Sequence, residues 1–383
     1  MNSPSATSHL PVQTSASANA TPTPTDSLRP ISKAALPPSP VNAVEKIQVL
    51  CTRSFSDPQL DYLRTVSPRL IVEQHRANSA AELGRMIRPD TEVLFTSLAP
   101  ETLATAPRLR WLQTRGAGVN QLVGTPVWNS NVMITTASGL HAGPIGEYVV
   151  GMMVALARDF LGFLDFQRRA CWPMKPRVHF EQFPGRELRG STVLIVGYGS
   201  IGREVARLCH VLGLRIIAVK RHPEEHADSG FVMPGTGDPN GSLPEKFVAP
   251  SQLDEVLPAA DYVVVSAAST HETRHLIGEP QLRLMRPDAF LINIARGDVI
   301  DQSALARALQ ERWIAGAGLD VFEKEPLPAD SPLWQLENVI LSPHVAGITP
   351  RYDEHVVEIF AENLRRYVAG RELLNLIDRT RGY

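Results

Sequence analysis

Short apolar runs alternate with longer segments of helical hydrophobic spacing from about residue 46 to the end of the chain. The runs in the first part are Ile47–Leu50, Leu70–Val72, Glu92–Phe95, Arg110–Gln113 and Val132–Thr135. The runs in the second part, which begins at Ser191, are Val193–Val196, Arg215–Val219, Tyr262–Val265, Phe290–Ile294, Ala315–Asp320 and Val339–Leu341. Strands that alternate with helices are typical of βαβ units, so two parallel sheets are expected.

Two longer helices are expected, one where these series meet and one near the end of the chain. The first begins near Pro144, because proline is well placed in the first turn of a helix. The second covers about residues 351–368 and carries apolar residues at Val356, Ile359, Phe360 and Leu364. We expect this apolar face to pack back onto the first series, which would make the first domain discontinuous.

Two segments have the composition of irregular structure. Residues 1–44 are mostly Ser, Thr, Ala and Pro, and such a segment cannot bury enough apolar surface to offset its ordering entropy. We predict a disordered tail there. It lacks the basic start and apolar core of a secretory signal, and scarce arginine makes an organelle transit peptide the less favoured alternative. Residues 230–244, rich in Gly and Pro, are predicted to form a surface loop.

The bulk composition narrows the class of protein. A chain of 383 residues with 43% hydrophobic residues is long enough for two domains with cores of their own. The net charge of −2 argues against a nucleic acid or an acidic membrane as partner. The most apolar stretch, Tyr148–Ala157, has about half the length that crosses a bilayer and is expected to be a buried helix.

The cysteines indicate a reducing compartment. Cys51, Cys171 and Cys209 are odd in number and far apart, with no spacing typical of a metal site or a redox pair. We therefore expect a cytoplasmic protein without a metal ion. Cys209 lies in a predicted buried helix, where core packing explains it better than a reactive thiol does.

A glycine-rich turn follows the run at residues 193–196. It reads Gly197-Tyr198-Gly199-Ser200-Ile201-Gly202 and leads into a predicted helix. A GxGxxG pattern alone is a weak signal, but between a buried strand and a helix it predicts a dinucleotide site. Gly197 permits the tight turn, Gly199 lets the backbone approach a pyrophosphate, and Gly202 allows close helix–strand packing. The N-terminus of the helix would face the phosphates.

The end of the next strand bears on the choice of dinucleotide. An NAD-specific fold is expected to place Asp or Glu about twenty residues after the glycine loop, on the ribose 2′-hydroxyl. Here Lys220 and Arg221 follow the strand, and the first acid is Glu224. Arginine pairs with a phosphate, whereas a carboxylate would repel it. The sequence therefore favours NADP over NAD, with merely solvated charges as the alternative.

An arginine, a glutamate and a histidine each follow a later strand of this second series. Arg296 comes after the run at 290–294, Glu325 after 315–320 and His344 after 339–341. The carboxyl ends of parallel strands meet at one edge of a sheet, so these side chains would converge beside the nucleotide. Arginine matches a carboxylate bidentately, and histidine can donate a proton near neutral pH. The set suits hydride transfer to a 2-keto acid.

Each of these residues also has an ordinary structural interpretation. Arg296 could be a surface ion pair, and His344 could be a hydrogen-bonded loop residue. Glu323 could be the working acid in place of Glu325. A carboxylate partner, whichever it is, would orient the imidazole and favour its protonated form.

Several motifs together resemble the D-isomer-specific 2-hydroxyacid dehydrogenase family from about residue 46 to the C-terminus. The matching stretches are Thr114–Gly118, His141–Glu147, Gly197–Gly202, Asn293–Asp301, Gly318–Pro326 and Ser342–Gly347. The resemblance implies an α/β fold with two Rossmann-like or flavodoxin-like domains, parallel sheets and a cleft between them. Together with the composition of the tail (1–44), it divides the chain into that tail, a substrate domain (45–145 plus 346–383) and a dinucleotide-binding domain (146–345).

The resemblance also implies a role for each matching residue. Arg296 resembles the arginine that holds the substrate carboxylate, and Glu325 and His344 resemble the acid–base pair. The backbone around Ala117 and Gly118 resembles a loop that also binds the carboxylate. The residues implied on the cofactor side include Asp320 at the nicotinamide carboxamide, Gly347 near the nicotinamide, and Ala295.

The chain departs from the family pattern in some places. Ser266–Thr270 stands where a proline-containing turn is usual, and Asn120 where aspartate is common. Formate-oxidising relatives carry glutamine before the proline that corresponds to Pro326, so Glu325 argues against that activity. Arg115 is one basic residue that could serve a phosphorylated substrate.

The resulting prediction is a cytoplasmic 2-hydroxyacid dehydrogenase that prefers NADP to NAD and resembles glyoxylate or hydroxypyruvate reductases. Its partners would be a small 2-keto or 2-hydroxy acid and a second copy of the chain. The segment at 160–189 resembles the dimerisation arm of the family, which implies a homodimer. The alternatives are a phosphoglycerate or phosphite dehydrogenase of the same family and a dinucleotide-sensing scaffold similar to a corepressor. The walls of the substrate pocket, which include Thr96–Ala99, leave the keto acid open.

Overall fold

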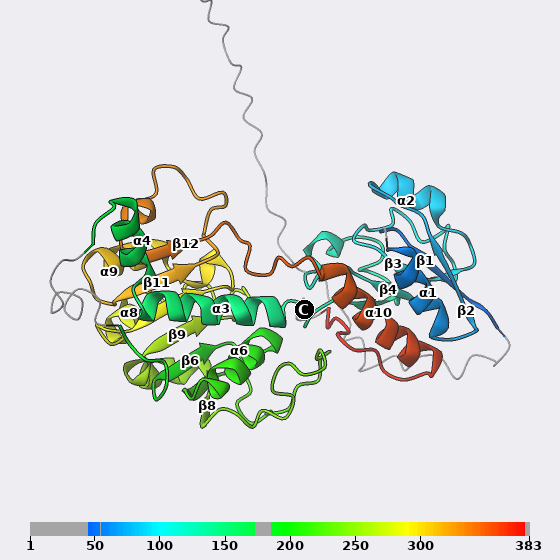
Figure 1. Ribbon diagram of the computed structural model, residues 1–383. Helices are drawn as coiled ribbons and strands as arrows, with labels where there is room; N and C mark the ends of the chain where they lie inside the picture. Colours follow the sequence, from blue (N-terminus) through cyan, green and yellow to red (C-terminus); the bar gives the residue numbers. More distant parts are fainter. Residues whose placement is uncertain (1–44, 54, 173–184, 380–383) are drawn as a thin grey trace, which may run out of the picture.

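The computed structural model describes residues 45–53, 55–172 and 185–379 of the chain. The predicted tail at 1–44 lies outside these residues. The described chain forms two α/β lobes, one around each of two sheets (Figure 1). Every strand pairing in both sheets is parallel, as the alternating pattern predicts.

The first sheet has the strand order β2-β1-β3-β4-β5. Its strands are β1 (Ile47–Cys51), β2 (Leu70–Gln74), β3 (Thr91–Phe95), β4 (Trp111–Gln113) and β5 (Met133–Thr135). All five match predicted runs to within a residue or two. Most of their residues are buried, as expected for a parallel sheet.

The second sheet has the strand order β12-β11-β10-β9-β6-β7-β8. Its strands are β6 (Thr192–Val196), β7 (Arg215–Val219), β8 (Lys246–Val248), β9 (Tyr262–Val265), β10 (Phe290–Asn293), β11 (Gly316–Leu319) and β12 (Val339–Leu341). The order reverses beside β6, so the carboxyl ends of β6 and β9 flank a topological switch point, where open α/β sheets bind ligands.

Helices cover both faces of each sheet. They are α1 (Asp57–Thr65), α2 (Ala80–Met86), α3 (Ala142–Ala157), α4 (Phe160–Arg168), α6 (Ser200–Val211), α7 (Leu253–Val256), α8 (Glu279–Leu284), α9 (Gln302–Gln310) and α10 (Tyr352–Val368). Short 3-10 turns lie at Asn120–Leu122, Pro250–Gln252, Leu257–Ala259, Gly297–Val299 and Pro332–Gln335. In the described part of the chain, no helix is both long enough and apolar enough to cross a membrane.

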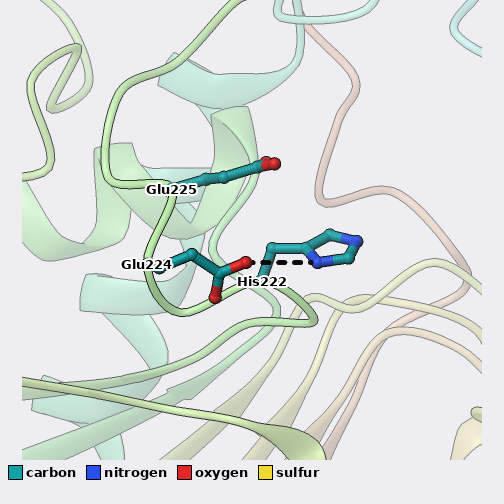
Figure 2. A group of neighbouring side chains, drawn as sticks. All are labelled: His222, Glu224 and Glu225. Carbon is teal, nitrogen blue, oxygen red and sulfur yellow. Dashed lines mark ion pairs between the residues drawn. The ribbon is translucent and has the colours of Figure 1, made fainter.

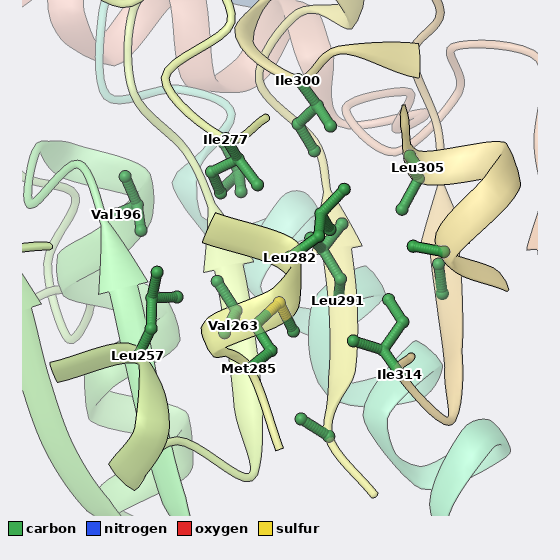
Figure 3. Close-up of a cluster of buried hydrophobic side chains, with 14 of the residues drawn as sticks. Val196, Leu257, Val263, Ile277, Leu282, Met285, Leu291, Ile300, Leu305 and Ile314 are labelled. Atoms are coloured by element: carbon green, nitrogen blue, oxygen red, sulfur yellow. The ribbon is translucent and has the colours of Figure 1, made fainter. Parts of the chain in front are cut away.

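Alternate residues of the second sheet build two separate cores. On β6, Val193 and Ile195 face α3 and α6, whereas Leu194 and Val196 face α7, α8 and α9. Figure 3 shows the second of these cores, with Val263, Leu291 and their neighbours packed under the helices. Cys209 lies fully buried in the first core, as predicted, and burial raises the pKa of its thiol to about 12.

The last helix returns to the first sheet. Its predicted apolar residues Val356, Ile359, Phe360 and Leu364 are all buried in one cluster with β1 and β3. The ring of Phe360 lies 4.9 Å from that of Phe95 on β3. The chain therefore crosses between the lobes twice, once before α3 and once before α10 (Figure 1).

The loop between β7 and β8 differs from the sequence prediction. It was expected to lie on the surface, but Phe231 and Asp238 are buried. Phe231 packs with Leu140 in the core of the first lobe, and its main-chain N donates to Asn375 Oδ1 at 3.0 Å. Strand β8 was missed, because three residues after a Gly/Pro-rich segment carry too little periodicity to indicate a strand.

Candidate functional site

The glycine loop lies between β6 and α6, at the switch point of the second sheet. Gly197 has φ +101°, and a Cβ there would lie 2.5 Å from the main-chain N of Ala267, so only glycine fits. Gly199 is the N-cap of α6, with no side-chain cap and open space where a Cβ would project. The first turn of α6 holds no acid. These uncapped N–H groups fit the phosphates of a dinucleotide.

The other residues of the loop are placed as follows. Tyr198 is buried, and its hydroxyl donates to Asp238 Oδ2 at 2.7 Å. Burial and this carboxylate raise the pKa of Tyr198, so the phenol stays protonated. Ser200 and Ile201 begin α6 and are half-buried, while Gly202 is buried against the carbonyl of Gly197. The side chain of Tyr198 thus holds the β7–β8 loop through Asp238.

Two cations follow β7, where the sequence predicts the adenosine ribose. Arg221 Nη2 lies 2.7 Å from Glu272 Oε2, in a pair exposed to solvent. Lys220 Nζ donates to the main-chain carbonyl of Glu225. Partial burial and the charge of Arg203 lower the pKa of Lys220, against the opposing effect of Glu225 and its acidic neighbours.

Three exposed side chains lie beside these cations. His222, Glu224 and Glu225 bring one nitrogen or oxygen each to within 4.8 Å of one another (Figure 2). His222 Nδ1 is 3.5 Å from Glu224 Oε1. All three are exposed, and exposed acidic groups commonly gather without an ion, so we assign no metal to this cluster.

The predicted catalytic trio converges from the ends of β10, β11 and β12. Glu325 Oε2 lies 2.8 Å from His344 Nδ1, and Glu325 Oε1 accepts from the main-chain N of Phe322 at 3.0 Å. Partial burial raises the pKa of Glu325, but the hydrogen bonds from His344 and Phe322 outweigh it and hold that pKa below its usual range. Because Nδ1 faces the carboxylate, Nε2 of His344 is the nitrogen left for another group.

Arg296 completes this group. It follows β10, is exposed, and its Nη1 donates to Ala295 O at 2.7 Å. Its charge reaches both Glu325 and His141, whose pKa values it lowers. Asn293, which begins one of the matching stretches but received no role from the sequence, ends β10, donates to Arg296 O at 3.2 Å and accepts from Ala295 N at 3.1 Å. A polar residue closing an apolar strand was the signal that could have found it.

Glu323, the alternative acid, points elsewhere. Its carboxylate lies 3.1 Å from His275 Nε2 and accepts from the main-chain N of Gln302 at 3.2 Å. It therefore ties the segment after β11 to the start of α9. The geometry favours Glu325 as the partner of His344.

Asp320 and Gly347 lie on either side of the His344 turn. Asp320 is 2% exposed, and its carboxylate accepts from Val345 N, Ala346 N and the Ser342 hydroxyl. The carbonyl oxygen of Gly347 accepts from His141 Nδ1 at 3.2 Å, and a Cβ at Gly347 would lie 2.8 Å from that nitrogen. Burial is the largest effect on the pKa of His141, and it lowers that pKa.

The loop of the first lobe follows β4. Ala117 and Gly118 are exposed, with open space where a Cβ of Gly118 would lie. Arg115, proposed as a site for a phosphorylated substrate, instead pairs with Asp353 Oδ1 at 2.5 Å and lies over the ring of Tyr352, 4.3 Å from its centroid. Its guanidinium therefore joins this loop to α10.

Comparison with known proteins agrees with this arrangement. Residues 150–346 match the family model described as D-isomer specific 2-hydroxyacid dehydrogenase, NAD binding domain. The chain is 33% identical to a glyoxylate reductase from Thermococcus gammatolerans over 330 residues, covering 85% of this chain and 94% of the relative.

Two solved structures have the same architecture. A D-isomer specific 2-hydroxyacid dehydrogenase family protein from Aeromonas salmonicida is 28% identical, with a TM-score of 0.65, and the match covers 88% of this chain and all of the other. A D-isomer specific 2-hydroxyacid dehydrogenase from Xanthobacter autotrophicus in complex with NADPH and MES is 27% identical, with a TM-score of 0.67 and the same coverage.

The glycine loop, the Arg296, Glu325 and His344 group and these matches lead to one conclusion. The chain belongs to the D-isomer specific 2-hydroxyacid dehydrogenase family, as an oxidoreductase that transfers a hydride to or from a nicotinamide dinucleotide.

Proposed function

We propose that the protein reduces a small 2-keto acid, of the glyoxylate or hydroxypyruvate class, to the D-2-hydroxy acid. The observation that carries the proposal is the 2.8 Å pair of Glu325 and His344 beside Arg296, at the carboxyl edge of the second sheet. The glyoxylate reductases among the relatives support the substrate class. Glu325, in place of glutamine, supports reduction over formate oxidation.

Each residue of the group has a step to perform. Arg296 binds the substrate carboxylate through its planar fork, with main-chain N–H groups at Ala117 and Gly118 on the other side. His344 Nε2 donates a proton to the carbonyl oxygen as negative charge develops there. Glu325 orients the ring through Nδ1 and stabilises the imidazolium before the transfer. The bound reduced nicotinamide supplies the hydride.

The dinucleotide is expected to lie along Gly197–Gly202, with its phosphates at the N-terminus of α6. Ala295, Asp320 and Gly347 would line the nicotinamide end. We propose a preference for NADP because Lys220 and Arg221 follow β7 and no acid precedes Glu224. A relative solved with NADPH supports this preference.

We also propose a division of the chain into domains and an oligomeric state. We assign residues 45–145 and 346–383 to substrate binding and 146–345 to the dinucleotide. We also propose a cytoplasmic homodimer, with α4 in the interface. In support, α4 has no buried residue and exposes Phe160 and Leu164, which are 44% and 45% exposed. Residues 173–184 of the expected arm lie outside the described chain.

The test is an assay of the purified full-length protein with glyoxylate, hydroxypyruvate and larger 2-keto acids, each with NADPH and with NADH. We expect turnover with a small keto acid, faster with NADPH, and its loss in His344→Ala. A protein that binds the dinucleotide but turns over no keto acid would instead be the sensing scaffold. Turnover of 3-phosphoglycerate or phosphite alone would favour those dehydrogenases, although Arg115 is committed to Asp353.

A further inference from the structure

His344 sits in a backbone conformation that side chains rarely adopt. Its φ is +56°, in the left-handed region, although the residue is not glycine. Such a conformation persists where the surrounding contacts impose it, and it is common at functional sites. The contacts that impose it here identify residues on which the placement of the imidazole depends.

The first of these contacts come from Asp320, at the end of β11. The main-chain carbonyl of Asp320 accepts from His344 N at 2.9 Å. Its carboxylate accepts from the next two N–H groups, Val345 N at 2.8 Å through Oδ1 and Ala346 N at 2.9 Å through Oδ2. One buried residue thus binds three successive main-chain donors of the turn.

A second layer of hydrogen bonds holds this carboxylate. The Ser342 hydroxyl donates to Asp320 Oδ1 at 2.5 Å, and Tyr148 Oη lies 2.6 Å from Ser342 Oγ. A serine hydroxyl has a single hydrogen, and here the carboxylate takes it, so Tyr148 is the donor to Ser342. Burial, first of all, raises the pKa of Tyr148 to about 12, which keeps this donor protonated.

Tyr148 lies on α3, the helix that begins where the chain enters the second lobe. The residue before that helix, His141, contacts Gly347 at the far end of the same turn. Helix α3 and its N-cap therefore hold both ends of the segment that carries His344. We propose that Tyr148 is a positioning residue for the reaction, which acts through Ser342 and Asp320 to keep the His344 imidazole at Glu325.

This inference rests on the proposed role of His344 as proton donor. The test compares Tyr148→Phe with Tyr262→Phe, which is a matched control. Tyr262 is buried in the core against which Tyr148 packs. Within the described chain, the Tyr262 hydroxyl has no hydrogen-bond partner. Both variants remove one hydroxyl and keep the ring, but only Tyr148→Phe breaks the path to His344.

We expect Tyr148→Phe to lower kcat for the keto acid about three- to tenfold, the worth of one hydrogen bond, with a fall in Tm of no more than a few degrees. The alkaline limb of kcat/KM should move to lower pH, because a displaced ring gains less from the Glu325 charge. Ser342→Ala should act in the same direction, and Tyr148→Phe should add little to it if the two act in series.

Either of two results would overturn the inference. One is a Tyr148→Phe enzyme with the kcat and the pH profile of Tyr262→Phe; the other is a loss explained entirely by a lower Tm. Full activity in His344→Ala would instead remove the proposed function, so the two failures are distinguishable.

Discussion

Glu325 binds two neighbours at once, with Oε1 accepting from Phe322 N and Oε2 facing Nδ1 of His344 at 2.8 Å. The first bond ties the carboxylate to the segment that leaves β11, and the second joins it to the turn after β12. The two catalytic candidates therefore have fixed relative positions before any substrate binds. This preorganisation is what a proton donor needs, because its geometry costs no reorganisation during the reaction.

Glu325→Gln should keep the size of the side chain and remove its charge. The alkaline limb of keto-acid reduction should shift to lower pH, because no carboxylate stabilises the imidazolium. In the unmutated protein the pKa of Glu325 lies below its usual range, so the carboxylate stays charged to lower pH than an isolated glutamate. Its contribution is complete above the ordinary glutamate pKa and is lost as pH falls through the lowered one.

The measurement is kcat/KM against pH at saturating dinucleotide, with Glu323→Gln as the control. Glu323 bonds to His275 and Gln302, so its variant should keep the normal profile. A shift in Glu323→Gln alone would show that the other glutamate works with His344.

Arg296→Lys should raise KM for the keto acid. Lysine keeps the charge but lacks the planar fork, so transition-state stabilisation should fall by roughly 1.5–3 kcal/mol, the worth of one charged hydrogen bond. Binding of the dinucleotide, measured by fluorescence titration, should not change. Arg283→Lys on the exposed surface of α8 is the control. Unaltered keto-acid kinetics in Arg296→Lys would remove it as the carboxylate ligand.

Arg221→Ala should weaken the use of NADPH far more than that of NADH, by roughly 1.5–3 kcal/mol in kcat/KM. The reason is the loss of a guanidinium beside the 2′-phosphate. Glu272→Gln makes a second test, because Glu272 competes for the same guanidinium at 2.7 Å. It should improve the use of NADPH and leave that of NADH unchanged. Equal effects on both dinucleotides would contradict the assignment.

Phe231→Ala should destabilise the protein by about 3 kcal/mol, because a large aromatic side chain leaves the core of the first lobe. Chemical denaturation followed by fluorescence would measure the loss. Val211→Ala, at an exposed position on α6, should cost far less. A small change in Phe231→Ala would mean that the β7–β8 loop does not depend on its contact with the first lobe.

Much of the architecture could be predicted from the sequence, because the strands and helices follow from the hydrophobic pattern of neighbouring residues. Runs such as Val193–Val196 are apolar at every position, which a strand buried on both faces requires, and the intervening segments have helical spacing. Arg296, Glu325 and His344 could be placed near strand ends because each follows one of these apolar runs. Strand β8 and the burial of Phe231 could not be predicted, because the residues around them show no hydrophobic periodicity.

The sequence by itself determined the two parallel sheets, the glycine loop, the return of α10 and the set of candidate catalytic residues. Only the tertiary structure showed that Glu325, and not Glu323, lies against His344, that Arg115 pairs with Asp353, and that Tyr148 is joined to the His344 turn. Hydrophobic periodicity is written into neighbouring residues, so it can be read along the chain. The direction in which a charged or hydroxyl side chain points depends on partners from distant elements, and these meet only when the chain folds.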